Sequence, residues 1–134
     1  MILRAAFFDR DNTLLHMDPA LRAARTAKIE GWTGRPYHQT YEEMMELFRR
    51  AGYPEGLKSV QEEIRFWRRY YRELLEEEGV TDCLEERAEE LWDMTWLKGY
   101  QLFPETREVL DWFRSRGVRM GVISDTSPSL PLTL

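Results

Sequence analysis

Residues 5–15 of the chain read AAFFDRDNTLL, a short apolar run that ends abruptly in polar side chains. The run over residues 2–8 is apolar apart from Arg4, and it predicts a buried β-strand. Residues i and i+2 at the end of a strand project to the same side, so we expect Asp9 and Asp11 to point into one small volume. Two anions this close repel each other, and one would bind a proton unless a cation lies between them. Because Mg²⁺ prefers hard oxygen ligands such as carboxylates, the pair predicts a magnesium site.

Length and composition place the chain among globular proteins. It has 134 residues, enough for one domain with its own core, of which 43% are hydrophobic and 32% charged. The net charge is −5 and no basic stripe is present, so neither nucleic acid nor an anionic membrane is an expected partner. An anionic substrate would have to be attracted by a local device, such as a metal ion or a nest of backbone N–H groups.

The sequence carries no positive signal for a cellular location, so the location is inferred by default. Cys83 is the single cysteine, so no intrachain disulfide can form and a reducing compartment is expected. The N-terminal apolar run stops at Asp9, which is typical of neither a secretory signal nor a membrane span. We therefore expect a cytoplasmic protein.

Between the first strand and residue 98 the pattern is almost continuously helical. Capping boxes at Thr40–Glu43 and Ser59–Glu62 predict two helix starts, and glycines such as Gly31 suit the helix ends. Helices are therefore predicted at about 19–30, 41–52, 60–78 and 82–98. The apolar face of the third comprises Val60, Ile64, Trp67, Tyr71, Leu74 and Leu75.

After residue 99 the pattern returns to alternating helix and strand. A helix is predicted from about 105 to 116, followed by a strand at 118–124 that again ends in polar residues. A strand, a long helical connection and a second strand predict a parallel pair with a right-handed crossover. The carboxyl ends of parallel strands lie at one edge of the sheet, where ligands of open α/β sheets bind. An active site is therefore expected where the two strands end.

Residues 8–14, FDRDNTL, resemble the first motif, hhhDxDxT, of the haloacid dehalogenase-like (HAD) hydrolase superfamily. The resemblance implies that Asp9 is a nucleophile that becomes phosphorylated and that Asp11 is the general acid and base of the phosphatase branch. It also implies that Mg²⁺ is held by the Asp9 side chain and the Asp11 backbone carbonyl. Asn12 replaces the usual glycine, which is a mild departure because asparagine tolerates the left-handed backbone.

The likeness extends to the predicted second strand. Residues 122–125, VISD, resemble the second motif of the superfamily, whose hydroxyl binds the transferring phosphoryl group. It implies that Ser124 binds substrate, with Asp125 beside it as a further candidate or, alternatively, an ordinary loop acid. The backbone N–H of Arg10 would cradle phosphate oxygens, and Thr13 would support the loop.

The resemblance implies an α/β fold: a Rossmann-like parallel-sheet core, of which this chain would supply only the first two strands, with an inserted α-helical cap. The core would comprise residues 1–15 and 99–134, and the cap residues 16–98. A catalytic lysine and a late acidic pair would follow residue 125, so we expect the chain to be the N-terminal part of such an enzyme. A sheet of two strands has open edges that would allow self-association.

The expected function is that of a Mg²⁺-dependent phosphatase acting on a small phosphate monoester through an aspartyl-phosphate. Asp11 argues against a dehalogenase, which lacks an acid at that position. The alternative is a non-catalytic remnant or interaction module that lacks the later motifs. A reading frame that continues into a lysine and an acidic pair would favour the enzyme, whereas a natural stop would favour the remnant. The sequence does not single out one phosphate ester.

Overall fold

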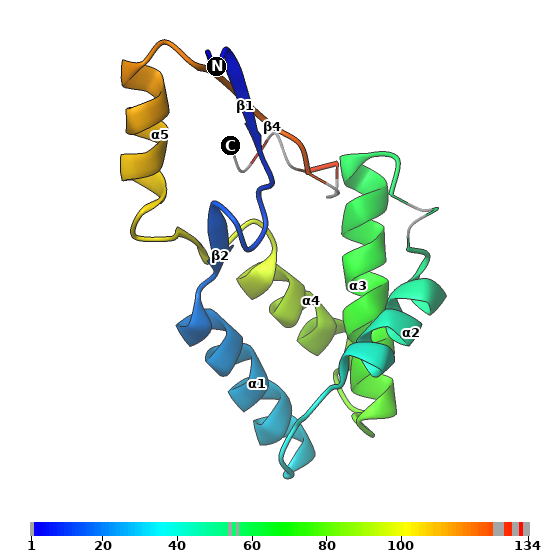
Figure 1. Ribbon diagram of the computed structural model, residues 1–134. Coiled ribbons are helices and arrows are strands. Elements are labelled where there is room, and N and C mark those ends of the chain that lie inside the picture. The colour runs from blue at the N-terminus through cyan, green and yellow to red at the C-terminus, as the bar shows by residue number, and fades with distance from the viewer. Residues whose placement is uncertain (1, 54, 56, 125–127, 130–131, 133–134) are drawn as a thin grey trace. The chain divides into compact units, whose positions relative to one another are not determined.

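The computed structural model describes residues 2–53, 55, 57–124, 128–129 and 132 (Figure 1). The described chain forms two compact units. The sheet unit comprises the described residues of Met1–Asp18 and Gly99–Thr126, and the helical unit those of Pro19–Lys98 and Ser127–Leu134. The elements follow in the order β1 (Ala5–Phe8), β2 (Leu15–Met17), α1 (Pro19–Thr33), α2 (Tyr41–Ala51), α3 (Val60–Glu77), α4 (Leu84–Thr95), β3 (Tyr100–Leu102), α5 (Thr106–Ser115) and β4 (Arg119–Val122).

The sheet unit is built on the pairing of β1 with β4. The two strands are parallel, in a register that places Ala5 opposite Arg119 and Phe8 opposite Val122. This confirms the α/β class and the parallel pair predicted from sequence. Both strands are shorter than predicted, since β1 begins at Ala5 and β4 ends at Val122.

Only one face of this pair is covered within the described residues. On that face Phe8 packs edge-on against Phe113 of α5, with ring centroids 5.4 Å apart. On the opposite face the ring of Phe7 lies over Gly121, and the side chains of Phe7 and Ile123 are 67% and 66% exposed. The prediction of a buried first strand is therefore wrong for Phe7, because an apolar run does not reveal how many layers cover a sheet.

A second, antiparallel pair was not predicted. In it β2 pairs with β3, so that Leu15 lies opposite Leu102 and Met17 opposite Tyr100. The N–H of Asp18 donates to the carbonyl of Gly99 at 2.5 Å and continues the ladder. The chain therefore leaves the sheet unit and returns to it at adjacent points.

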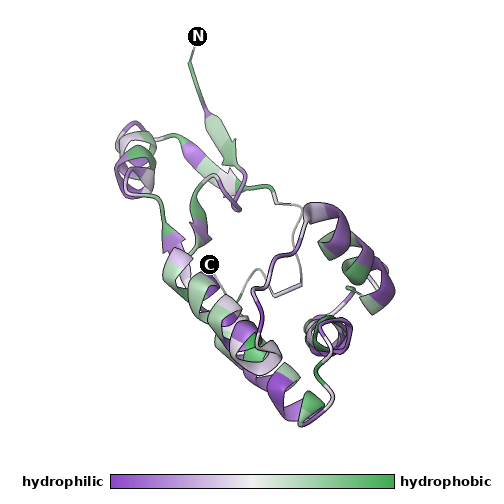
Figure 2. Ribbon diagram, turned by 90° about the horizontal axis from the view of Figure 1, so that it is seen from below, coloured by the Kyte–Doolittle hydropathy of each residue, from purple (hydrophilic) through white to green (hydrophobic). Residues whose placement is uncertain are grey.

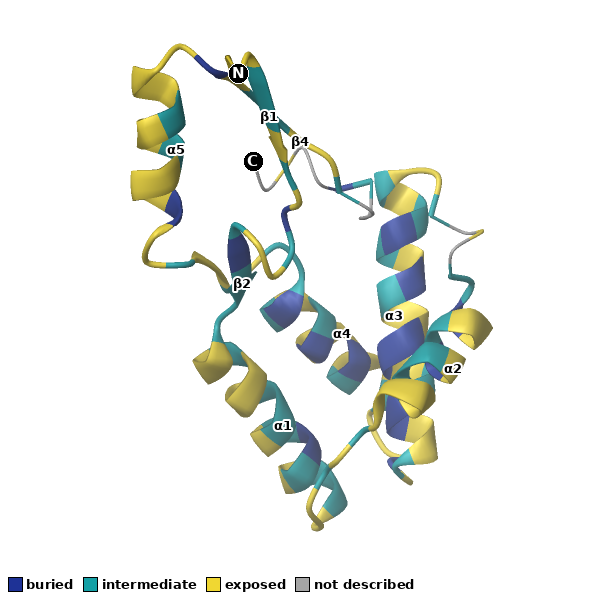
Figure 3. Ribbon diagram, viewed as in Figure 1, coloured by how far each residue is buried: buried dark blue, intermediate teal, exposed yellow. Residues whose placement is uncertain are grey.

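The helical unit contains α1 to α4, and α3 packs against both α2 and α4. Polar and apolar residues occupy different sides of these helices, and the buried positions gather on α3 and α4 (Figures 2 and 3). Gly31 does not end α1 as predicted. The helix continues to Thr33 and ends before Gly34, whose φ of +70° suits a helix terminus. Ile29 in the last turns of α1 is fully buried, and this packing outweighs the weak helix propensity of glycine. The assignment of this unit as a cap stays a prediction.

The buried face of α3 agrees with the prediction at Tyr71, Leu74 and Leu75 and differs from it elsewhere. The structure buries Phe66 and Tyr70, whereas Val60 and Ile64 are only half-buried. The cause is Phe48 of α2, whose ring contacts Phe66, Trp67 and Tyr70 at centroid distances of 5.0–5.6 Å. The direction from which α2 approaches therefore sets which side of α3 is covered.

A charged residue also lies inside the helical unit. Glu63 on α3 is 2% exposed, and its carboxylate is fully engaged. Oε1 accepts from the Ser129 hydroxyl at 2.7 Å and from the Trp96 indole at 3.4 Å, and Oε2 accepts from the Ser129 N–H at 2.8 Å. Three donors offset the cost of burying this group.

The predicted capping box is complete at α2, whereas only half of it forms at α3. The Thr40 hydroxyl accepts from the Glu43 N–H, and the Glu43 carboxylate accepts from the Thr40 N–H, so the first capping box is confirmed. The Glu43 carboxylate also accepts from the Thr40 hydroxyl at 3.0 Å, and the two bonds that it accepts, the one from the Thr40 N–H above all, lower the pKa of Glu43. Ser59 caps α3 in the same way, but the Glu62 carboxylate accepts from the Lys58 N–H at 2.9 Å instead of completing the second box.

Replacing Thr40 with alanine should lower the free energy of unfolding by about 1 kcal/mol, because the Glu43 N–H loses its acceptor. The matched control is Thr40→Ser, which keeps the hydroxyl and should stay close to wild type. Urea denaturation followed by circular dichroism measures both. An equal loss in the two variants would contradict a capping role.

Stability should fall with rising alkaline pH through Tyr70, whose hydroxyl donates to Gln39 at 3.0 Å. Burial, above all, raises the pKa of Tyr70 from 10.0 to about 12, so between these values the folded chain binds more protons than the unfolded chain. The free energy of unfolding then falls by at most about 1.4 kcal/mol per pH unit on account of this group. In urea titrations Tyr70→Phe should make the slope shallower, and Tyr41→Phe, at an exposed tyrosine, should not change it.

Candidate active site

The predicted site residues lie where β1 and β4 end side by side (Figure 1). The N–H of Ile123 donates to the carbonyl of Phe8 at 3.0 Å, which extends the pairing to the last residues of the ladder. Neighbouring strands are about 4.8 Å apart, so Asp9 and Ser124 continue the chain from adjacent points. Asp9 is exposed and Ser124 half-buried. Asp125 lies outside the described residues.

A tight turn follows β1, and within it the N–H of Asn12 donates to the carbonyl of Leu15 at 2.8 Å. The oxygen of Arg10 accepts from the N–H groups of Thr13, Leu14 and Leu15 at 3.4, 3.0 and 3.2 Å. Asn12 has a φ of +57°, so the left-handed conformation expected at this position is confirmed. The Thr13 side chain is exposed, and its supporting role stays a prediction.

Arg10 contacts both of the predicted catalytic acids. Its backbone N–H donates to Asp9 Oδ1 at 2.8 Å, and its guanidinium Nη1 donates to Asp11 Oδ1 at 3.0 Å. The guanidinium carbon lies 4.6 Å from the ring centroid of Tyr100 on β3, and the side chain is only 4% exposed. The structure therefore places a cation beside Asp11, and repulsion between the two acids does not by itself require a metal ion.

The donors at this site suit Mg²⁺ in kind but do not form a complete set. Among the described residues, no group of three or more histidine, cysteine, aspartate or glutamate side chains could hold a metal ion. Mg²⁺ needs only one or two carboxylates and takes its remaining oxygens from water or phosphate. Asp9 is exposed, and from the residues that the structure describes it receives one hydrogen bond, to Oδ1 from the Arg10 N–H, so it is the carboxylate best placed to bind a cation. The metal site stays a prediction.

A further residue of the site was missed by the sequence analysis. Thr106, at the start of α5, is 4% exposed, and its hydroxyl donates to the carbonyl of Leu14 at 2.7 Å. The N–H of Phe103 donates to the same carbonyl at 3.2 Å. These bonds fasten the end of the turn to the segment that leads into α5. The only signal in the sequence is a small polar residue at a helix start.

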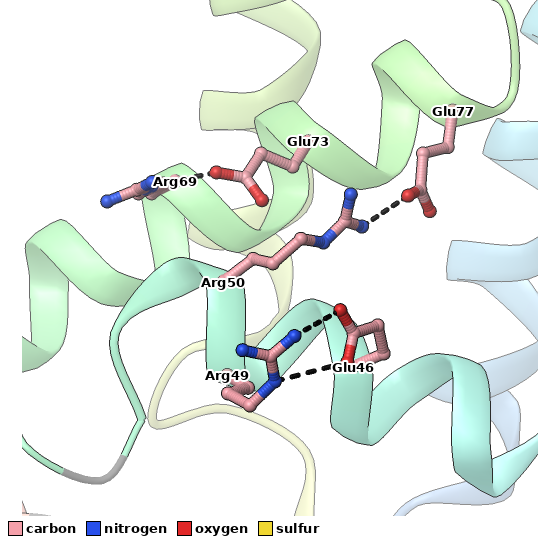
Figure 4. A network of polar contacts seen from close by, with 6 residues as sticks. All are labelled: Glu46, Arg49, Arg50, Arg69, Glu73 and Glu77. Carbon is pink, nitrogen blue, oxygen red and sulfur yellow. Dashed lines mark hydrogen bonds and ion pairs between the residues drawn. The ribbon is translucent and has the colours of Figure 1, made fainter.

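A shallow groove on the helical unit is a weaker candidate. Its lining arginines and glutamates pair with one another along and between α2 and α3, as Figure 4 shows in part. Exposed pairs of this kind stabilise a fold only weakly, because solvent screens the two charges. Because the lining charges are balanced, the groove offers no surplus charge to attract an ionic ligand. The lining residues are Arg50, Arg69, Arg72, Glu73, Glu76 and Glu77.

Comparisons with known proteins bear on the whole chain. A family model described as "haloacid dehalogenase-like hydrolase" matches residues 3–133. No curated protein matches. Among solved structures, the 2-haloacid dehalogenase from Pseudomonas syringae pv. Tomato DC3000 is similar, with a TM-score of 0.51 and 23% sequence identity. The match covers 93% of this chain and 56% of that protein, and at this identity the likeness concerns the fold.

We expect Thr106→Val to destabilise the sheet unit by about 1 kcal/mol, because the Leu14 carbonyl loses one of its two donors. Thr106→Ser retains the hydroxyl and serves as the control. Urea unfolding gives the energy, and amide hydrogen exchange at Leu14 and Leu15 tests the location. Unchanged exchange in the valine variant would show that Thr106 does not hold the turn.

Proposed function

The chain belongs to the haloacid dehalogenase-like hydrolases, and on that premise we propose that it forms part of a Mg²⁺-dependent phosphatase for small phosphate monoesters. The observation that carries the proposal is the second acid, Asp11, two residues after Asp9 at the end of β1. A mechanism through a covalent intermediate needs both a nucleophile and a separate proton donor. The acid pair can supply both roles.

In the proposed reaction a carboxylate oxygen of Asp9 attacks phosphorus and the bond to the ester oxygen breaks. Asp11 gives a proton to the departing oxygen, which leaves as an alcohol. Asp11 then takes a proton from water, whose oxygen attacks the aspartyl-phosphate and releases inorganic phosphate and free Asp9. Mg²⁺, held by the Asp9 side chain and the Asp11 carbonyl, would reduce the repulsion between the carboxylate and the anionic substrate.

Three further groups are proposed to bind the phosphoryl oxygens or shape the loop around them. The Ser124 hydroxyl follows β4 and would donate to the phosphoryl group. The Arg10 N–H, now bonded to Asp9, would be shared with a phosphate oxygen. Thr13 would support the turn, and Asp125 stays a weaker candidate for contact with the substrate.

Hydrolysis of a 2-haloacid is the second candidate, and the name of the similar solved structure favours it. An aspartate nucleophile would serve there as well, attacking carbon and releasing halide. That reaction has no evident use for a second acid that protonates a leaving oxygen. Asp11 therefore favours phosphate ester hydrolysis over dehalogenation.

The test uses the complete product of the reading frame, assayed with 4-nitrophenyl phosphate and with 2-chloropropionate, with and without Mg²⁺. Wild type should release phosphate only in the presence of Mg²⁺. Asp9→Asn should reduce that turnover by more than about 10³-fold, because the nucleophile is removed. Asp111→Asn, at an exposed acid of α5, is the matched control and should retain activity.

Each other outcome points to a different conclusion. Mg²⁺-dependent turnover that survives in Asp9→Asn would reject the nucleophile. Release of chloride without phosphate would favour the dehalogenase. Activity on neither compound, with a reading frame that stops at residue 134, would favour the non-catalytic alternative.

A further inference from the structure

The Arg10 side chain is buried with fewer hydrogen-bond acceptors than its guanidinium needs. A guanidinium that is 4% exposed needs close to a full set of acceptors to offset the loss of hydration. Arg10 has one carboxylate oxygen, on Asp11, and the face of the Tyr100 ring. Its Nε is buried and has no hydrogen-bond partner among the described residues.

We propose that the Arg10 side chain is a positioning residue that fixes the orientation of the Asp11 carboxylate and links it to β3 through Tyr100. The inference rests on the proposed function, in which Asp11 is the acid and base. It assigns the Arg10 guanidinium a task separate from the one expected of its backbone N–H.

The contact leaves Asp11 available for chemistry. Only Oδ1 of Asp11 is bound by Arg10, and the Asp11 side chain remains 43% exposed. One oxygen is therefore fixed while the carboxylate stays accessible to a reacting group. An aspartate held in one rotamer transfers a proton more efficiently than one that samples several.

Tyr100 connects the Arg10–Asp11 ion pair to a second strand. It belongs to β3 and lies opposite Met17 of β2, directly after the point where the chain returns from the helical unit. The planar guanidinium lies over the ring at 4.6 Å, a contact that depends on the flat shape of arginine. The orientation of Asp11 is thereby tied to the strand at this junction.

The test compares two substrates in the complete enzyme. An alkyl phosphate has a poor leaving group that needs the proton of Asp11, whereas the 4-nitrophenolate of 4-nitrophenyl phosphate leaves with little need of it. Since kcat/KM reports phosphoryl transfer to Asp9, Arg10→Met should lower kcat/KM by about 10²-fold on the alkyl ester and by only a few-fold on the aryl ester.

Four variants are matched to this one. Arg10→Lys keeps the charge but not the flat guanidinium and should recover part of the loss. Tyr100→Leu should reproduce the substrate-dependent loss in weaker form, whereas Tyr100→Phe keeps the ring and should not. Arg114→Met removes an exposed arginine–aspartate pair on α5 and should leave both substrates unaffected.

A second measurement does not depend on activity. The scalar couplings between the Hα and Hβ protons of Asp11 should report one rotamer in wild type and an average in Arg10→Met. Equal losses on both substrates, or couplings that do not change, would overturn the positioning role. A wild-type enzyme that hydrolyses neither phosphate would instead overturn the proposed function on which the inference rests.

Discussion

The parallel ladder between β1 and β4 is the constraint on which the candidate site depends. The bond from the Ile123 N–H to the Phe8 carbonyl lies at the point where both strands end, so Asp9 and Ser124 start from neighbouring positions. Parallel strands cannot be joined by a tight turn and need a long connection. Here the connection includes the helices α1 to α4, and the site is built by residues from opposite ends of the described chain. The antiparallel pair β2–β3 holds together the two ends of the helical part of this connection, because β2 precedes α1 and β3 follows α4.

Two charged side chains are buried in the part of the chain that the structure describes, and their hydrogen bonding differs greatly. Glu63 in the helical unit receives three hydrogen bonds, two from Ser129 and one from Trp96, so its carboxylate is well satisfied. Arg10 in the sheet unit contacts one carboxylate oxygen and one aromatic ring, and its Nε has no hydrogen-bond partner among residues 2–53, 55, 57–124, 128–129 and 132. Residues held in an energetically unfavourable arrangement often lie at functional sites. The contrast separates a group that stabilises the fold from one whose arrangement serves the acids beside it.

Features governed by neighbouring residues could be predicted from the sequence, and features governed by tertiary packing could not. The Thr40 capping box and the left-handed Asn12 need only a few adjacent residues, and the parallel strand pair follows from the order of elements. The strands β2 and β3 are each three residues long, too short for any period to appear. The exposure of Phe7 and the buried side of α3 depend on which elements approach them. Within the site, the motif placed Asp9 and Asp11, whereas the role of the Arg10 side chain required Tyr100, which is remote in sequence.

The charges at the end of β1 constrain how a cation could act there. Two aspartates so close in sequence would ordinarily share one counter-ion, and Mg²⁺ is the obvious choice. In this chain the guanidinium of Arg10 forms an ion pair with Asp11, whereas Asp9 is exposed and, among the described residues, accepts a single backbone N–H. In the proposed enzyme the two acids would then have separate counter-ions, with arginine beside the proton donor and the metal ion beside the nucleophile. Such a division would leave the oxygens of Asp9 to the metal ion and the substrate, while the guanidinium would hold Asp11 in the orientation that proton transfer to the leaving oxygen needs.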